Sequence, residues 1–225
     1  MENYKKIFIA LALFAYASVP FAQTFGIKAG FNLSTMLSKD NDRTYRDIFK
    51  LNPGFHVGAT AEVTLNKTFS FEPALLLTTK GYRYNQRLTL DDGTTVAQKD
   101  NTTLYYIDIP LNVKATFKLG NTKPYIFSGP YLGFGIAGNS KQEATYLGHT
   151  YKSNTKINWG SGDSPSYKRM DFGLNIGAGV AIKALAFGVS CSIGAANITN
   201  NTDKGHKTKN RGIGISIGYR LLKKH

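Results

Sequence analysis

Apolar and polar residues alternate with a period of two along six segments of the chain. From Phe25 to Ser34, Phe, Ile, Ala, Phe and Leu occupy the odd positions, and Gly, Lys, Gly, Asn and Ser the even ones. The same alternation runs through 55–65, 105–117, 171–182, 185–196 and 212–221. Successive side chains of a β-strand point to opposite faces, so each segment is predicted to be a strand with one apolar and one polar face.

Two further segments, 69–82 and 124–136, alternate poorly and contain prolines at positions 73, 124 and 130. Proline cannot donate to a strand ladder, so we expect bulges or strand ends near these residues. With these two segments the predicted strands number eight.

The links between the predicted strands fall into two alternating classes. The links 66–68, 118–123 and 183–184 are short, whereas 35–53, 85–101, 137–166 and 199–211 are long and polar. Outer-membrane barrels alternate short periplasmic turns with long external loops in this way. The pattern predicts an all-β fold, an eight-stranded antiparallel up-and-down transmembrane β-barrel with both termini in the periplasm.

A soluble, lipocalin-like ligand-binding barrel is the alternative fold, because it also has eight alternating strands. In that fold the apolar face points inward and the polar face meets water. Here the polar face is rich in glycine, including Gly26, Gly30, Gly177 and Gly214, and the apolar face is bulky throughout. Small residues suit a narrow lumen, so we expect the apolar face to point toward lipid.

The first 22 residues have the features of a secretory signal peptide. Lys5 and Lys6 precede an apolar stretch over 7–17, and Pro20 precedes a predicted cleavage after Ala22. We therefore expect a cleaved signal peptide over 1–22, a β-barrel domain over 23–225, and a location in the bacterial outer membrane.

The charge of the chain adds a constraint on partners. Its formal net charge is +14, which is compatible with nucleic acid or with an anionic membrane surface. Export favours the membrane surface, so we expect outer-membrane lipid and lipopolysaccharide as partners, and no nucleic acid. Cys191 is the single cysteine, which excludes an internal disulfide.

Eight charged residues fall on the predicted lumen face, four of each sign. They are Lys28, Glu62, Glu72, Lys80, Asp108, Lys114, Asp171 and Arg220. Counting along the strands places Glu72 near Lys114 and Lys80 near Asp108, with Lys28 and Arg220 in the same layer as the first pair. Unpaired charges in a narrow lumen are costly, so we expect an ion-pair network that fills it.

No residue pattern indicates catalysis. The four histidines lack metal-ligand spacing, and no serine lies beside a histidine on the predicted lipid face. His56 is interpreted as a structural lumen residue. We therefore predict no catalytic, metal or cofactor site, and a protein that is not an enzyme.

Two external features could contact a partner or lipopolysaccharide. Trp159, the only tryptophan, lies in the longest predicted loop, in a glycine-rich stretch. Lys204, Lys207, Lys209 and Arg211 make the last predicted loop basic, and lipopolysaccharide carries phosphates that such side chains bind. A mobile loop tip and a solvated charge run are the alternative interpretations.

Six segments of the chain resemble the outer-membrane β-barrel family of Bacteroidota, often labelled porin family or PorT-type. They are FGIKAGFNLS at Phe25, FSFEPALLLTTKGY at Phe69, YYIDIPLNVKATF at Tyr105, KPYIFSGPYLGF at Lys123, DFGLNIGAGV at Asp171 and RGIGISIGYRL at Arg211. The resemblance implies outer-membrane insertion and eight strands. One departure is the ending, which continues past Tyr219 where related barrels finish at an aromatic residue.

Three functional hypotheses follow. The barrel is a structural or lipid-anchoring protein, a surface or secretion-system partner, or a small diffusion pore. Side chains can fill an eight-stranded interior, so the sequence favours the first two over an aqueous channel.

Overall fold

The computed structural model describes residues 23–41, 44–45, 49–89, 94–160, 167–200 and 202–221. The predicted signal peptide over 1–22 lies outside these residues, as does the end of the chain beyond Leu221.

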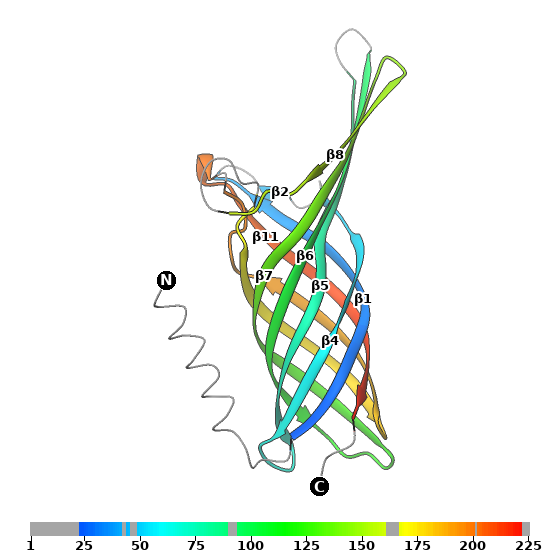
Figure 1. Cartoon of the computed structure of the whole chain (residues 1–225), viewed down its shortest axis with the longest axis vertical. Helices are drawn as coiled ribbons and strands as arrows, with labels where there is room; N and C mark the ends of the chain where they lie inside the picture. Colours follow the sequence, from blue (N-terminus) through cyan, green and yellow to red (C-terminus); the bar gives the residue numbers. More distant parts are fainter. Residues whose placement is uncertain are drawn as a thin grey trace.

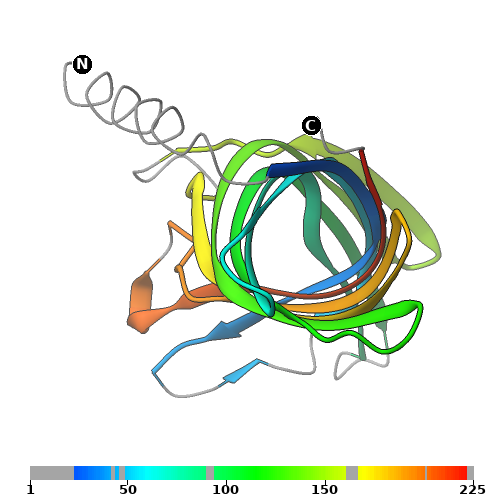
Figure 2. The ribbon, with the colours of Figure 1, turned by 90° about the horizontal axis from the view of Figure 1, so that it is seen from below.

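Eight long antiparallel strands close into a barrel, which confirms the predicted fold class (Figures 1 and 2). Each strand pairs with the next in this group, and the last pairs back with the first, from Gly26 opposite Arg220 to Lys39 opposite Lys207. The strands are β1 (Gln23–Lys39), β4 (Asn52–Thr64), β5 (Phe69–Thr89), β6 (Thr95–Thr116), β7 (Thr122–Tyr146), β9 (Met170–Ile182), β10 (Leu185–Gly194) and β11 (Lys207–Arg220).

Four smaller elements attach to the barrel. The short strand β2 (Thr44–Tyr45) pairs with β1, β3 (Phe49–Lys50) pairs with β5, and β8 (His149–Lys156) pairs with β7. A 3-10 turn, η1 (Asp203–Gly205), precedes β11. No helix in the described part of the chain is long and apolar enough to cross a bilayer.

The barrel wall is apolar outside and polar inside. Phe31 exposes 73% of its surface and Ile215 exposes 58%, whereas Lys114 and Asp171 on the opposite face expose 3% and 0%. A soluble barrel would bury the first pair and expose the second. The structure therefore contradicts the lipocalin-like alternative, because the bulky face points toward the surroundings, where lipid can solvate it.

Two predicted loops are largely strand. β5 and β6 remain paired up to Thr89 opposite Thr95, and β7 and β8 up to Tyr146 opposite His149. These strands form a four-stranded sheet that rises above one end of the barrel, and we call its part beyond Gly81 the blade (Figure 1). The prediction of loops over 85–101 and 137–166 was wrong for these residues, because water on both faces removes the apolar alternation by which a strand is recognised.

A β-bulge interrupts β7 at the base of the blade. Tyr105 lies opposite Ala137 while Tyr106 lies opposite Gly135, so Ile136 is an extra residue without a partner on β6. This bulge lies six residues beyond Pro130, where none was predicted; Pro124 lies near the start of β7, as expected, but Pro130 keeps a regular pairing with Leu174. No bulge occurs between β5 and β6, which keep one register from Phe69 opposite Ala115 to Thr89 opposite Thr95. Pro73 fits this register because its fixed backbone angle is compatible with an extended strand.

Candidate functional site

The lower part of the lumen, at the end away from the blade, contains a cluster of five charged side chains. The register on either side, Thr60 opposite Ala74 and Val63 opposite Phe71, places Glu62 of β4 opposite Glu72 of β5. Two carboxylates at such positions repel each other unless a cation lies between them. Lys114 of β6 supplies that cation.

The distances within this lower cluster describe an unbroken chain of ion pairs. The Lys114 ammonium lies 2.8 Å from Glu62 and 2.5 Å from Glu72. Lys28 of β1 lies 3.1 Å from the other oxygen of Glu72, and the Arg220 Nε of β11 lies 3.7 Å from Glu62. Three cations thus neutralise two carboxylates, and the five residues come from five different strands.

An upper cluster lies nearer the blade and has the opposite balance of charge. The Lys80 ammonium of β5 lies 2.9 Å from both Asp108 of β6 and Asp171 of β9. The Tyr131 hydroxyl and the Asn210 side-chain amide also donate to Asp171, at 3.2 and 2.9 Å. Every charge in this cluster is therefore held by at least one direct partner.

Aromatic rings enclose the Lys80 ammonium from two sides. Its nitrogen lies 4.6 Å from the ring centre of Tyr106 and 4.5 Å from that of Tyr131, distances at which a cation is attracted to a ring face. The rings therefore fill part of the cross-section beside the ion pairs. Lys80 is 7% exposed and Asp171 is fully buried.

The space between and below the clusters is small. A cavity of about 90 Å³ is lined by Lys28, His56, Asn112, Tyr131 and Asn175, among others. A second cavity of about 30 Å³ lies against Glu62, Glu72 and Lys114. Cavities of this size leave room for a few ordered waters beside the ion pairs.

All eight charged residues expected in the lumen lie in these two clusters. The two expected proximities, Glu72 with Lys114 and Lys80 with Asp108, occur as direct ion pairs. Lys28 and Arg220 lie in the lower cluster, as their positions on the first and last strands suggested. The lower cluster has an excess of one positive charge and the upper cluster an excess of one negative charge, so together they are neutral.

Above the upper cluster, a group of apolar side chains closes the mouth of the barrel. We call this group the cap, and its buried members are Met36, Leu104, Tyr106, Trp159, Ala196 and Ile198. Trp159 packs edge-on against Tyr106, with ring centres 5.5 Å apart, and lies 6.2 Å from Tyr167. Burial among these groups, and the neighbouring Tyr82, raise the pKa of the Tyr167 phenol well above its usual value.

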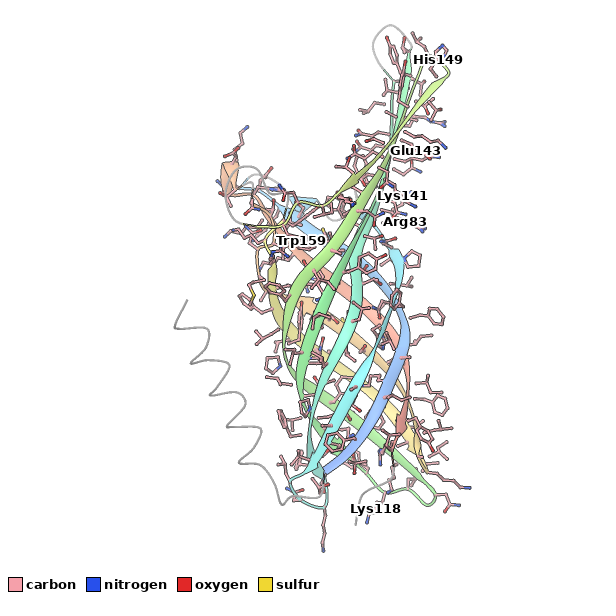
Figure 3. The ribbon with its side chains drawn as sticks, in the orientation of Figure 1. Arg83, Lys118, Lys141, Glu143, His149 and Trp159 are labelled. Carbon is pink, nitrogen blue, oxygen red and sulfur yellow. The ribbon has the colours of Figure 1, made fainter. Side chains whose placement is uncertain are left out.

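The position of Trp159 corrects the expectation of an external partner contact. Its side chain is 9% exposed and points into the junction between the barrel and the blade (Figure 3). A side chain at Gly135 could not coexist with it, since a Cβ there would lie 2.3 Å from the indole ring. The loop around Trp159 folds inward because the ring can bury its apolar surface in the mouth of the barrel.

Sequence reasoning missed the cap, although a signal for it was present. Met36 continues the lumen phase of β1, and Leu104 and Tyr106 continue that of β6, so apolar residues replace polar ones on the inner face near the mouth. It also missed Tyr131 and Asn210 as partners of Asp171. These residues lie on strands whose register with β9 and β5 the sequence leaves open.

The predicted basic rim follows the outer face of β11. Lys207, Lys209 and Arg211 are in phase with the lipid-facing Ile213, and Lys204 lies in η1. None of these four side chains belongs to the lumen clusters.

A serine and a histidine meet near this rim. The Ser38 hydroxyl lies 2.7 Å from the His206 Nε2 and 3.4 Å from the Thr208 hydroxyl. The pairing of β1 with β11 creates this contact across 168 residues of sequence, so no local motif could reveal it. Ser38 is 3% exposed, which leaves its oxygen closed to a substrate, and the contact fastens η1 to the barrel wall.

Among the residues that the structure describes, no group of three or more histidine, cysteine or acidic side chains is arranged to hold a metal ion. The arrangement as a whole is suited to filling the lumen and fixing seven of the eight strands to one another.

Comparisons with known proteins agree with this architecture. Residues 21–203 match the model of a family described as outer membrane protein beta-barrel domain. No curated protein gives a significant match.

Several solved structures are similar in fold. Neisserial surface protein A is 13% identical, with a TM-score of 0.41, and the match covers 88% of this chain and 97% of that chain. Outer membrane protein W of Escherichia coli is 15% identical, with a TM-score of 0.35, over 89% of this chain and 99% of that chain. The E. coli outer membrane protease OmpT is 11% identical, with a TM-score of 0.37, over 91% of this chain and 99% of that chain. Similarity at this level extends to the fold and not to a shared activity.

Proposed function

This chain belongs to the outer membrane protein beta-barrel domain family, and we propose that it is a closed, non-conducting barrel of the outer membrane that presents a rigid sheet outside the cell. The observation that carries the proposal is the filled lumen, in which two ion-pair clusters and the cap lie one above another. Within the family, the six segments quoted above favour the PorT-type branch.

The filled lumen leads to an electrical prediction. The purified, refolded protein is expected to give no stable current steps of porin size in planar bilayers, because water would have to displace paired charges in both clusters. Lys114→Ala alone is expected to remain silent, since the upper cluster and the cap stay intact. A known porin inserted under the same conditions serves as the positive control. Stable open channels from the unmodified protein would instead support the small diffusion pore.

The direction of insertion follows from the lengths of the hairpins. The blade stands at one end, and the short turns, including the one that carries Lys118, lie at the other (Figure 3). Outer-membrane barrels keep short turns in the periplasm, so the blade is proposed to be external, with Gln23 and Arg220 near the periplasmic side.

Cysteine labelling tests this orientation. In a Cys191→Ser background, a cysteine replacing His149 at the blade tip is expected to react with a membrane-impermeant maleimide on intact cells. A cysteine replacing Asn121 in the short turn is expected to react only after the outer membrane is opened. The reverse pattern would show that the barrel is inserted the other way.

The surface is proposed to act through binding rather than catalysis. Buried Ser38 offers no open nucleophile, and the rim residues Lys204, Lys207, Lys209 and Arg211 are suited to lipopolysaccharide phosphates. A secretion-system or other surface protein is the second kind of partner that an external sheet could engage. Crosslinking and pull-down from intact outer membranes would separate anchoring in lipid from assembly with such a protein.

A further inference from the structure

The two faces of the blade have different chemistry, and the strand register shows which residues lie on each face. On β5 and β6, Tyr82 lies opposite Thr102 and Arg83 opposite Asn101. Tyr82 and Thr102 continue the lumen side, because Thr102 is 1% exposed and lies next to the cap. Arg83 and Asn101 therefore continue the outer, lipid-facing side of the barrel.

The register of β6 with β7 and of β7 with β8 extends this outer face across the whole blade. Lys141 lies opposite Asn101, Glu143 opposite Lys99, and Lys152 opposite Glu143. The short strand β3 adds Lys50, which lies opposite Arg83. The charged residues of the outer face are Lys50, Arg83, Arg87, Lys99, Lys141, Lys152, Lys156 and Glu143.

Seven cations against one carboxylate make this face strongly basic. All seven are exposed, and within the described part of the chain Lys152 alone among them forms an ion pair, at 3.3 Å from Glu143. The opposite face instead carries Asp100, whose carboxylate accepts hydrogen bonds from Thr102 and Ser140. The positive charge is therefore confined to one side of the sheet.

The basic face is continuous with the lipid-facing surface of the barrel. Ile136 and Phe134 are about half exposed at the top of the apolar belt, and Lys141 lies four residues beyond Ala137 on the same strand. At 3.4 Å per residue and a tilt of about 40°, that separation corresponds to about 10 Å along the membrane normal. By the same count Lys156, which pairs with Asn139, lies about 5 Å above the belt.

A bilayer core of about 30 Å is flanked by polar zones of about 5 to 8 Å on each side, so Lys156 lies within the headgroup layer and Lys141 lies just above it, where a long side chain can reach down to the headgroups. We propose that the outer face of the blade binds the phosphate groups of outer-leaflet lipopolysaccharide through Arg83, Lys141 and Lys156. Arg83 and Lys141 stand two strands apart, about 10 Å, so their long side chains can converge on one headgroup. The upper cations Arg87, Lys99 and Lys152 face the more distant anionic sugars. The inference rests on the proposed external position of the blade and extends the lipid contact beyond the β11 rim.

The test uses the full-length mature protein in nanodiscs of zwitterionic lipid, titrated with fluorescent lipid A that carries both phosphates. Each cation near an anionic surface contributes about fivefold in affinity, so Arg83→Gln, Lys141→Gln and Lys156→Gln together are expected to weaken binding about 100-fold. A charge-preserving Arg83→Lys, Lys141→Arg variant is expected to stay within about threefold of the unmodified protein. Lipid A without phosphates is expected to bind equally to the unmodified and triple-substituted proteins.

A matched control removes the same charge from the other end of the barrel. Lys118→Gln, Lys123→Gln and Lys183→Gln lie in or beside the short turns, and together they are expected to leave lipid A affinity unchanged. Equal losses in both triple variants, or a loss in neither, would overturn the proposal and leave the basic face as a solvated surface that discourages edge pairing. A blade variant that lost dextran sulfate binding but kept lipid A binding would also overturn the proposal, because the basic face would then bind a soluble polyanion and not lipid. Nanodiscs expose both ends of the barrel, so a wrong orientation would be detected by cysteine labelling and would not mimic any of these results.

Discussion

Replacing Lys80 with methionine is expected to lower the free energy of unfolding by about 3 to 5 kcal/mol. The ammonium is the direct cationic partner of Asp108 and Asp171, both buried, and it fills the space between the rings of Tyr106 and Tyr131. Methionine retains most of the volume but leaves two carboxylates without a counter-ion in a narrow lumen. The loss is measured by urea titration of the protein folded in lipid vesicles, with Trp159 fluorescence and gel migration as independent probes.

Two further variants identify the cause of that loss. Lys152→Met removes an exposed ion pair of the blade, and it is expected to cost less than about 1 kcal/mol. Adding Asp108→Asn and Asp171→Asn to Lys80→Met is expected to recover much of the stability, because neutral amides no longer need a cation. A cost below about 1 kcal/mol for Lys80→Met would show that water, and not the lysine, compensates the two carboxylates.

Replacing Ile109 with lysine is expected to cost about 2 to 4 kcal/mol, because the side chain lies on the outer face, near the middle of the apolar stretch of β6, and would place a charge in hydrocarbon. Ile109 is 39% exposed and lies opposite Leu132 on β7. Asn112→Ser, three residues further on the lumen face, is expected to cost about 1 kcal/mol or less. Refolding titrations in vesicles compare the two variants, and equal tolerance would show that the inner and outer faces are wrongly assigned.

The wall of the barrel was predictable because its two faces have different solvents. In β1, the contrast between Phe31 and Asn32 repeats along the strand, and this fixes which side meets lipid without any knowledge of the neighbours. The pairing of Lys114 with Glu72 was predictable by counting equal depths from one end of β5 and of β6, because the short links 66–68 and 118–123 mark those two strand ends. Where a short turn joins two strands, sequence determines register as well as face.

The blade and the cap were not predictable in this way. Residues farther out in the blade, such as Gln98 and Ala144, have water on both sides of their sheet, so no alternation marks them as strand. The residues around Trp159 have the glycine-rich composition of a loop tip. The burial of its ring depends on the space at Gly135, which exists only after the barrel has closed. Both features depend on contacts between segments distant in sequence, which no local pattern records.

Ile136, the unpaired residue of β7 at the base of the blade, lies where this strand passes from the barrel wall into the blade. Below Ile136, the odd-numbered residues of β7, such as Tyr131, point inward, whereas above it the even-numbered Ser140 points inward and contacts Asp100. Ile136 thus acts as a parity switch, and strand pairing continues on both sides of it. If β7 instead paired regularly through Ile136, without the bulge, the residues of β7 above it would change face, so that Lys141 would point inward and Ser140 outward.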